Sequence, residues 1–152
     1  MWTKQRFLEF VKTLNSQDWE ELAAQFMAEE LLVHTPGDGK LVGRRNFLDL
    51  FFIPMHNGVE EYFHPKTLVL DEPWLFVEAV LEYRCVRDHP TFPVQALNAG
   101  TTLWVDYFFL YGFTGDRIAS LKAVRYDGRL TDTPAGITPG LGSRLPSTIT
   151  EG

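Results

Sequence analysis

The apolar residues near the N-terminus recur with the period of an α-helix, which predicts three helices. Thr3 can cap the first helix, Ser16 can cap the second, and the third follows Gly43 and ends at Pro54. The apolar faces of the three helices consist of Phe7, Phe10, Val11 and Leu14; Trp19, Leu22, Ala23 and Phe26; and Phe47, Leu50, Phe51 and Phe52. We expect these faces to form part of the core.

After the third helix the pattern changes to that of long strands, and one short strand precedes that helix. A short strand over 30–35 precedes the turn at 36–39, and longer strands are predicted over 62–70, 74–88, 101–113 and 118–126. His64-Pro65 interrupts the first long strand and indicates a sheet edge or a bulge. The odd positions of 74–88 are nearly all apolar, so that face is predicted to be buried.

The opposite face of 74–88 and the C-terminal segment complete the predicted organisation. The even positions mix Trp74, Phe76 and Val80 with charged residues, which indicates a face that is half exposed or packed on a partner subunit. Residues after 127 are rich in Gly, Pro, Ser and Thr and show no periodicity. We therefore predict a single domain over 3–130 and a tail over 131–152 that is loose or laid over a neighbour.

Asp106 is the one acid within the aromatic strand 101–113. Trp104 and Phe108 share its face, and a carboxylate among such side chains is costly unless it has a partner or a function. Two interpretations stand equal on the pattern alone. Asp106 is either on the outer face, paired with a basic residue of the neighbouring strand, or at the bottom of an apolar pocket where desolvation raises its proton affinity.

Composition narrows the classes of function. The 152 residues are 45% hydrophobic and carry a net charge of −6, which favours one folded domain and disfavours nucleic acid or a membrane as partner. The single cysteine, Cys85, cannot form an internal disulfide, and the N-terminus lacks the apolar core of a signal peptide. We therefore expect a cytoplasmic protein.

Motifs for metal, phosphate or nucleophilic chemistry are absent from the sequence. The four histidines are far apart, and neither a glycine-rich phosphate loop nor a GxSxG motif occurs. Cys85 lies on the apolar face of its strand and is interpreted as an inert core thiol. We expect no metal and no cofactor, so any chemistry must come from carboxylate, imidazole, phenol and guanidinium groups.

Three segments in a characteristic order resemble one protein superfamily. They are LNSQDWEELAAQFMAEELLVHTPG, GRRNFLDLFF and DRIASLKAVRYDGRL, and together they fall within residues 3–130. In this order they are similar to the nuclear-transport-factor-like superfamily, and within it to the SnoaL-like enzymes. The resemblance implies an α+β fold in which a curved antiparallel sheet forms a cone and N-terminal helices close a deep apolar pocket. It also implies a dimer packed through the outer face of the sheet.

The resemblance can be tested residue by residue against two enzyme types of this superfamily. Asp106 looks like the oxyanion-hole aspartate of ketosteroid isomerases, but Thr35 stands where their base precedes a proline, and Phe10 stands where they have a tyrosine. Limonene-type epoxide hydrolases require an arginine where this chain has Trp104. Steroid isomerisation is therefore disfavoured. Epoxide hydrolysis of the limonene type, which uses an Asp-Arg-Asp set, fits no better.

The predicted site combines the remaining polar groups with apolar neighbours. Its catalytic residues are Asp106, Tyr83 and His34, and its substrate-binding residues are Phe10, Phe51, Trp104, Phe108 and Arg125. If Arg125 pairs with Asp106, the carboxylate acts as a base or electrostatic group; otherwise the protonated acid can donate. Strand alternation lets only one of His34 and Thr35 face the pocket, and a structural role is favoured for the histidine.

The predicted function is a cofactor-free acid–base enzyme of secondary metabolism. It would isomerise, cyclise, dehydrate or open an epoxide in a small apolar metabolite of polyketide or terpenoid type. The alternative is a non-catalytic module of the same fold that binds a small ligand or serves dimeric interaction. In either case the row of Trp74, Phe76 and Val80 predicts a two-fold homodimer.

Overall fold

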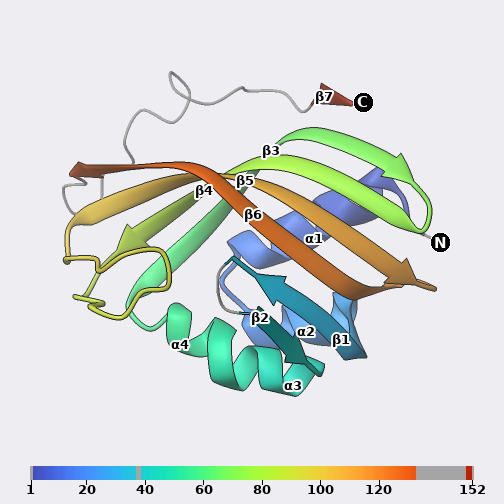
Figure 1. Cartoon of the computed structure of the whole chain (residues 1–152), viewed down its shortest axis with the longest axis horizontal. Helices are drawn as coiled ribbons and strands as arrows, with labels where there is room; N and C mark the ends of the chain where they lie inside the picture. The colour runs from blue at the N-terminus through green and yellow to red at the C-terminus, as the bar shows by residue number, and fades with distance from the viewer. Residues whose placement is uncertain (1, 37–38, 133–149, 152) are drawn as a thin grey trace.

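The N-terminal part of the chain is helical, as predicted. The computed structural model describes residues 2–36, 39–132 and 150–151, and the elements are seen in Figure 1. Helix α1 spans Lys4–Asn15 and α2 spans Trp19–Phe26, and both bury the predicted stripes apart from Trp19, which is only half buried. Thr3 caps α1 by accepting from the Arg6 amide, whereas Asp18, not Ser16, caps α2 by accepting from the Glu21 amide.

The third predicted helix consists of three short pieces in continuous order. Helix α3 spans Arg44–Phe47, the π-helix η1 spans Leu48–Phe52, and α4 spans Ile53–Met55. Pro54 has no amide hydrogen to donate to the Leu50 carbonyl, and its ring would clash with that carbonyl in a regular α-helix. The wider π-turn before Pro54 accommodates this conflict and keeps the helix continuous.

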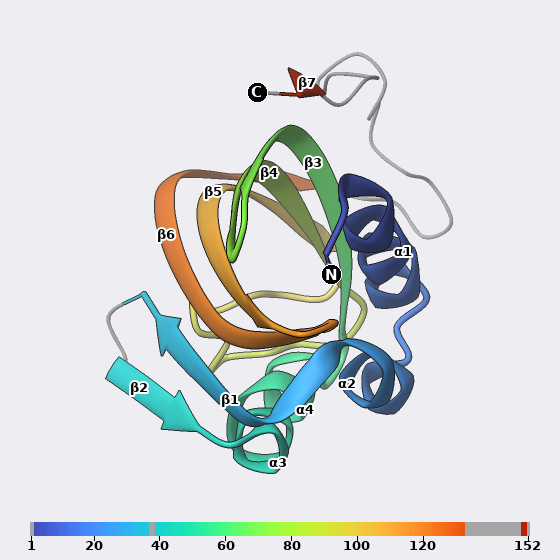
Figure 2. The same ribbon diagram turned by 90° about the vertical axis from the view of Figure 1, so that its right-hand side faces the viewer.

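The strands form a curved sheet that wraps around the helices on its concave side (Figures 1 and 2). The sheet has the strand order β2-β1-β6-β5-β4-β3-β7. Its strands are β1 (Met27–Thr35), β2 (Gly39–Val42), β3 (Val59–Asp71), β4 (Trp74–Cys85), β5 (Thr101–Thr114), β6 (Arg117–Asp132) and β7 (Thr150–Glu151). The helices pack on one side of a sheet whose long strands are antiparallel neighbours, so the α+β class and the cone shape are confirmed.

The sheet is mixed rather than antiparallel throughout, which corrects the expectation. Strands β3 to β6 are antiparallel neighbours, but β1 runs parallel to β6 and β7 runs parallel to β3. The chain returns from β1 to β6 only after α3, η1, α4 and the four strands β2 to β5 have intervened, so nothing forces these two neighbours to be antiparallel. The proline at residue 65 marks a bulge, since the β3–β4 register shifts between Pro65 and Thr67.

Two strand boundaries differ from prediction in ways that matter for the site. Strand β3 begins at Val59, three residues before the predicted start at Tyr62. Strand β6 continues to Asp132, so Thr131 and Asp132 belong to the sheet rather than to the predicted tail. Most of that tail, residues 133–149, lies outside the described residues. No helix in the described part of the chain is long and apolar enough to cross a membrane.

The core lies between the helices and the concave face of the sheet. Aromatic rings from several elements meet there, with Phe7 of α1 contacting Phe63 of β3 and Tyr111 of β5 at centroid distances of 6.0 and 5.2 Å. The odd positions of β4 are buried on this side, as predicted, and Cys85 is buried among them. The helices therefore cover the apolar side of the sheet and leave a pocket beyond the end of α1.

Candidate active site

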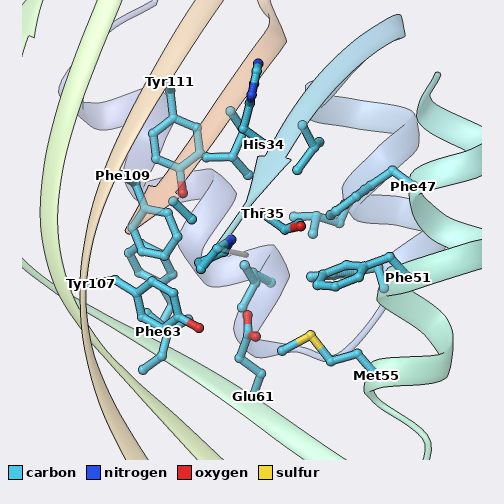
Figure 3. A pocket seen from close by; sticks show the side chains of 18 of the residues that line it. His34, Thr35, Phe47, Phe51, Met55, Glu61, Phe63, Tyr107, Phe109 and Tyr111 are labelled. Atoms are coloured by element: carbon cyan, nitrogen blue, oxygen red, sulfur yellow. The ribbon is translucent and has the colours of Figure 1, made fainter. Parts of the chain in front are cut away.

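A pocket of about 90 Å³ lies between the concave face of the sheet and the α3–η1–α4 helix (Figure 3). Most of its lining is apolar and aromatic, including Phe10, Phe47, Phe51, Met55, Phe63 and Phe109. The polar side chains that line it are His34, Thr35, Glu61, Tyr83, Tyr107 and Tyr111. An apolar cavity with a few polar groups is the usual form of a small-molecule site.

Glu61 is the buried acid of this pocket. Alternation along β3 places it on the concave face with Val59 and Phe63, and only 3% of its surface is exposed. Its backbone is held by Gln17, whose side-chain oxygen accepts from the Glu61 amide at 2.9 Å and whose side-chain nitrogen donates to the Glu61 carbonyl. Asn15 makes the same pair of bonds to Phe63. The side-chain amides of Gln17 and Asn15 thus bond to β3 as a neighbouring strand would, and this fixes the position of Glu61.

His56 lies behind Glu61 and completes a buried polar pair. The His56 Nε2 atom is 3.3 Å from Glu61 Oε1, and the Nδ1 atom is 2.6 Å from the Phe52 carbonyl oxygen. The imidazole packs against Trp19 and Phe52, with ring centroids at 4.2 and 4.4 Å. The histidine itself does not line the pocket, so it acts on a guest only through Glu61.

Two tyrosine hydroxyls lie beside the carboxyl group. Tyr83 on β4 pairs with Leu103 and Tyr107 on β5 pairs with Ala79, so the two side chains share the concave face, and the Tyr83 hydroxyl donates to the Tyr107 oxygen at 3.4 Å. Burial, then the adjacent Tyr107 and Glu61 groups, raise the pKa of Tyr83 well above its ordinary value. Burial also raises the pKa of Tyr107 to about 12. Both phenols therefore stay protonated at neutral pH and can donate hydrogen bonds.

Four of the predicted site residues line the pocket. Tyr83, His34, Phe10 and Phe51 are all in its wall. His34 and Thr35 both contribute, but Figure 3 shows the Thr35 hydroxyl directed to the interior and the His34 ring at the end far from Glu61. Of the polar residues among the four, only Tyr83 lies close to the buried acid.

Asp106 does not lie in the pocket, and this corrects the pocket interpretation. It pairs with Val80 across the β4–β5 ladder, so it lies on the convex face opposite to Glu61 and the tyrosines. Arg129 donates to its carboxylate at 3.2 Å, and 13% of the Asp106 side chain is exposed. The other interpretation, an outer-face acid paired with a base of the neighbouring strand, is the one observed. Its partner is Arg129 rather than Arg125.

Trp104, Phe108 and Arg125 also fall outside the pocket. Trp104 donates to Thr131 and Phe108 stacks on Tyr126, both on the convex face. The β5–β6 register shifts between Asp106 and Tyr107, so Arg125 stands opposite Tyr107 and Arg129 reaches Asp106. Leu121 and Ala123, on the same strand, do line the pocket.

The sequence interpretation missed Glu61, His56 and Tyr107. A signal for Glu61 was present, because extending the strand back to Val59 places the acid between two apolar residues on one face. His56 carries no such signal, since it stands in the irregular end of a helix and meets Glu61 only through the fold. Within residues 2–36, 39–132 and 150–151, no cluster of three or more His, Cys, Asp or Glu side chains could hold a metal ion.

Comparison with known families agrees with this architecture. The family model of the SnoaL-like domain matches residues 7–121, which is most of the chain. The chain belongs to the SnoaL-like domain family. The match includes every residue that lines the pocket except Ala123 and ends in the first part of β6. A search of curated proteins finds no match.

Solved structures share the fold of this SnoaL-like domain at low sequence identity. A candidate polyketide cyclase from Pseudomonas putida superposes with a TM-score of 0.69 at 14% identity, covering 84% of this chain and 92% of that one. A candidate polyketide cyclase from Xanthomonas campestris gives 0.66 at 16%, covering 78% and 86%. An LEH-like epoxide hydrolase from M. tuberculosis gives a TM-score of 0.63 at 12% identity, covering 80% of each chain. At these identities the likeness concerns the fold alone.

Proposed function

We propose that this SnoaL-like domain is a cofactor-free acid–base enzyme acting on a small apolar metabolite, with Glu61 as the group that transfers the proton. The observation that carries the proposal is a buried carboxyl group beside two protonated tyrosines in a mostly apolar pocket. The cavity volume of about 90 Å³ suits a compact guest.

Proton abstraction next to a carbonyl group is the chemistry this arrangement supports best. The Glu61 carboxylate takes a proton from the carbon beside the carbonyl, so the C–H bond breaks and an O–H bond forms on Glu61. The electron pair moves to the carbonyl oxygen, where a tyrosine hydroxyl donates a hydrogen bond to the developing charge. Return of the proton to another carbon of an enone gives isomerisation. Attack of the enolate carbon on a second carbonyl gives cyclisation: a C–C bond forms, the π bond of that carbonyl breaks, and the resulting alkoxide takes the proton held by Glu61. Solved neighbours of the same fold described as polyketide cyclases support this class.

The first prediction tests Glu61 against Asp106, the acid favoured by the sequence pattern. Small cyclic ketones and enones are incubated with the protein in D₂O, and loss of the proton signals beside the carbonyl is followed by NMR. Glu61→Gln should lower the exchange rate by roughly two to four orders of magnitude, the usual contribution of a positioned base. Asp106→Asn is the matched control, because it neutralises a carboxylate on the opposite face of the same sheet.

Three outcomes separate the alternatives. Exchange that depends on Glu61 and not on Asp106 supports the proposal. Exchange lost in Asp106→Asn but kept in Glu61→Gln contradicts it. Ketones that shift the resonances of pocket residues without any exchange in the wild-type protein favour the non-catalytic, ligand-binding module.

A further inference from the structure

The position of His56 behind Glu61 raises the question of how many protons the pair holds. Both side chains are almost completely enclosed, with 1% of the His56 side chain and 4% of the Glu61 side chain exposed. His56 does not line the pocket, so its ring must be satisfied by Glu61 or by the surrounding protein, whereas Glu61 also faces the cavity. A net charge on the pair would also be unfavourable, because burying an unpaired ion costs a large amount of free energy.

The Phe52 carbonyl fixes one proton of the imidazole. A carbonyl oxygen only accepts hydrogen bonds, and the His56 Nδ1 atom lies 2.6 Å from it. Nδ1 must therefore carry a hydrogen, because a bare nitrogen would place two lone pairs against each other. The packing of the ring between Trp19 and Phe52 holds this orientation.

The contact between Nε2 and Glu61 Oε1 then requires one further proton. If neither Nε2 nor Oε1 carried a proton, a lone pair on Nε2 would face a carboxylate oxygen at 3.3 Å. If both atoms carried a proton, two hydrogens would face each other. One proton gives either a neutral imidazole accepting from a protonated carboxyl group, or an imidazolium donating to a carboxylate. Both forms have no net charge, so both are compatible with burial.

We infer that His56 and Glu61 share a single proton, and that His56 is a positioning residue that holds Glu61 ready to act as acid or base. The functional part of this inference rests on the proposed function. In the imidazolium–carboxylate form Glu61 can take a proton from the guest, and the cation left on His56 offsets the negative charge of the enolate. The substrate class is thereby narrowed to carbonyl compounds that react through an anion.

The groups that face this pair from the surrounding elements are uncharged at neutral pH. Tyr83 on β4 and Tyr107 and Tyr111 on β5 all have a raised pKa, chiefly through burial, and remain phenols. Gln17 and Trp19 contribute an amide and an indole. The charge of Arg125 on β6 acts on the Tyr107 hydroxyl and lowers its pKa slightly against the effect of burial. The proton is therefore exchanged within the pair or with a guest.

The decisive measurement needs no substrate. Histidine is labelled with ¹⁵N, and the His56 signals are identified by their loss in His56→Gln or, if that variant does not fold, by eliminating the signals lost in His34→Gln, His64→Gln and His89→Gln. We expect Nδ1 to show the shift of a protonated nitrogen throughout the neutral range. A bare Nδ1 with the proton fixed on Nε2 would overturn the inference.

Catalytic measurements then separate the pair from the proposed function. The amide introduced by His56→Gln can donate a hydrogen bond to Glu61 but cannot exchange a proton. This variant should therefore slow ketone exchange on the order of 10²-fold, and the pH profile of the exchange rate should lose one limb. Binding of the ketone should stay unchanged, because residue 56 does not line the pocket. A protonated Nδ1 without exchange in the wild-type protein retains the pair and removes the function. A bare Nδ1 together with Glu61-dependent exchange would remove the shared proton and keep the proposed function. An unchanged pH profile in His56→Gln would contradict the positioning role of His56.

Discussion

Tyr107 shows what burial does to the chemistry of a single residue. Its hydroxyl has an ordinary pKa of 10.0, and burial raises this to about 12, with the hydrogen bond from Tyr83 acting in the opposite direction. Because the folded-state value lies above the unfolded-state value, the folded protein holds the proton more tightly. The resulting contribution to stability is complete below pH 10 and is lost as the pH rises towards 12.

Tyr107→Phe should therefore flatten the alkaline decline of the free energy of unfolding. Between pH 10 and 12 the difference in slope between wild type and variant should approach about 1.4 kcal/mol per pH unit, the value for one proton. Urea unfolding at closely spaced pH values measures it. Thr35→Val is a suitable control, since it removes a pocket hydroxyl that does not titrate in this range. Equal slopes for wild type and Tyr107→Phe would show that Tyr107 titrates normally in the folded protein.

The link between α1 and α2 shows how one element fixes a site on another. Gln17 adopts a left-handed backbone conformation with φ of 66°, which is uncommon for a residue with a side chain. This conformation turns its amide towards β3, where it bonds both backbone groups of Glu61. The backbone strain is thus coupled to the placement of the buried acid.

Replacing Gln17 separates the strain from the hydrogen bonds. Gln17→Ala loses both bonds to Glu61 and keeps the strain, so the free energy of unfolding should fall by about 1–3 kcal/mol. Gln17→Gly loses the same bonds but relieves the strain, so it should be more stable than the alanine variant by about 1 kcal/mol. Denaturant unfolding of the three proteins provides the comparison. An alanine variant as stable as wild type would mean that the clamp does not hold β3.

At the level of elements, the sequence predicts faces well and registers poorly. The stripe of α1 and the odd face of β4 are buried as their periodicity indicates. The position of Asp106 depends instead on which β4 residue it opposes, and the long connection over 86–100 leaves that pairing undetermined. Pairing with Val80 sends Asp106 to the convex face and Tyr107 to the pocket. A shift of one residue would have exchanged them, so the pattern alone could not identify the catalytic candidate.

At the level of the whole molecule, the sheet separates the pocket from a second apolar surface. The family fold was predictable because it depends on the order of helices and strands, whereas the parallel β1–β6 pairing depends on contacts distant in sequence. The convex face carries exposed residues from neighbouring strands, namely Trp74, Phe76, Val124 and Tyr126. Val80, which we expected in this row, is itself buried. Phe76, Phe108 and Tyr126 stack across β4, β5 and β6, so the aromatic part of the surface is continuous.

We propose that a second copy of the chain covers this convex surface in a two-fold dimer. A large exposed apolar surface on a sheet commonly marks an interface, and a two-fold arrangement lets the same residues face each other. Phe76→Glu would place a charge at the aromatic stack in both copies, and because the side chain points away from the pocket, the site should be unaffected.

Sedimentation velocity at micromolar concentration should show a dimer for wild type and a monomer for Phe76→Glu. Val42→Glu, on the edge strand β2, is the matched control, since it also replaces an exposed apolar residue but should leave the dimer intact. The monomeric variant should retain Glu61-dependent exchange, because Glu61 lies on the concave side of the sheet and Phe76 on the convex side. A wild-type monomer would remove the dimer proposal. Loss of exchange in a folded Phe76→Glu monomer would mean instead that the two faces of the sheet are coupled through the β4–β5 ladder.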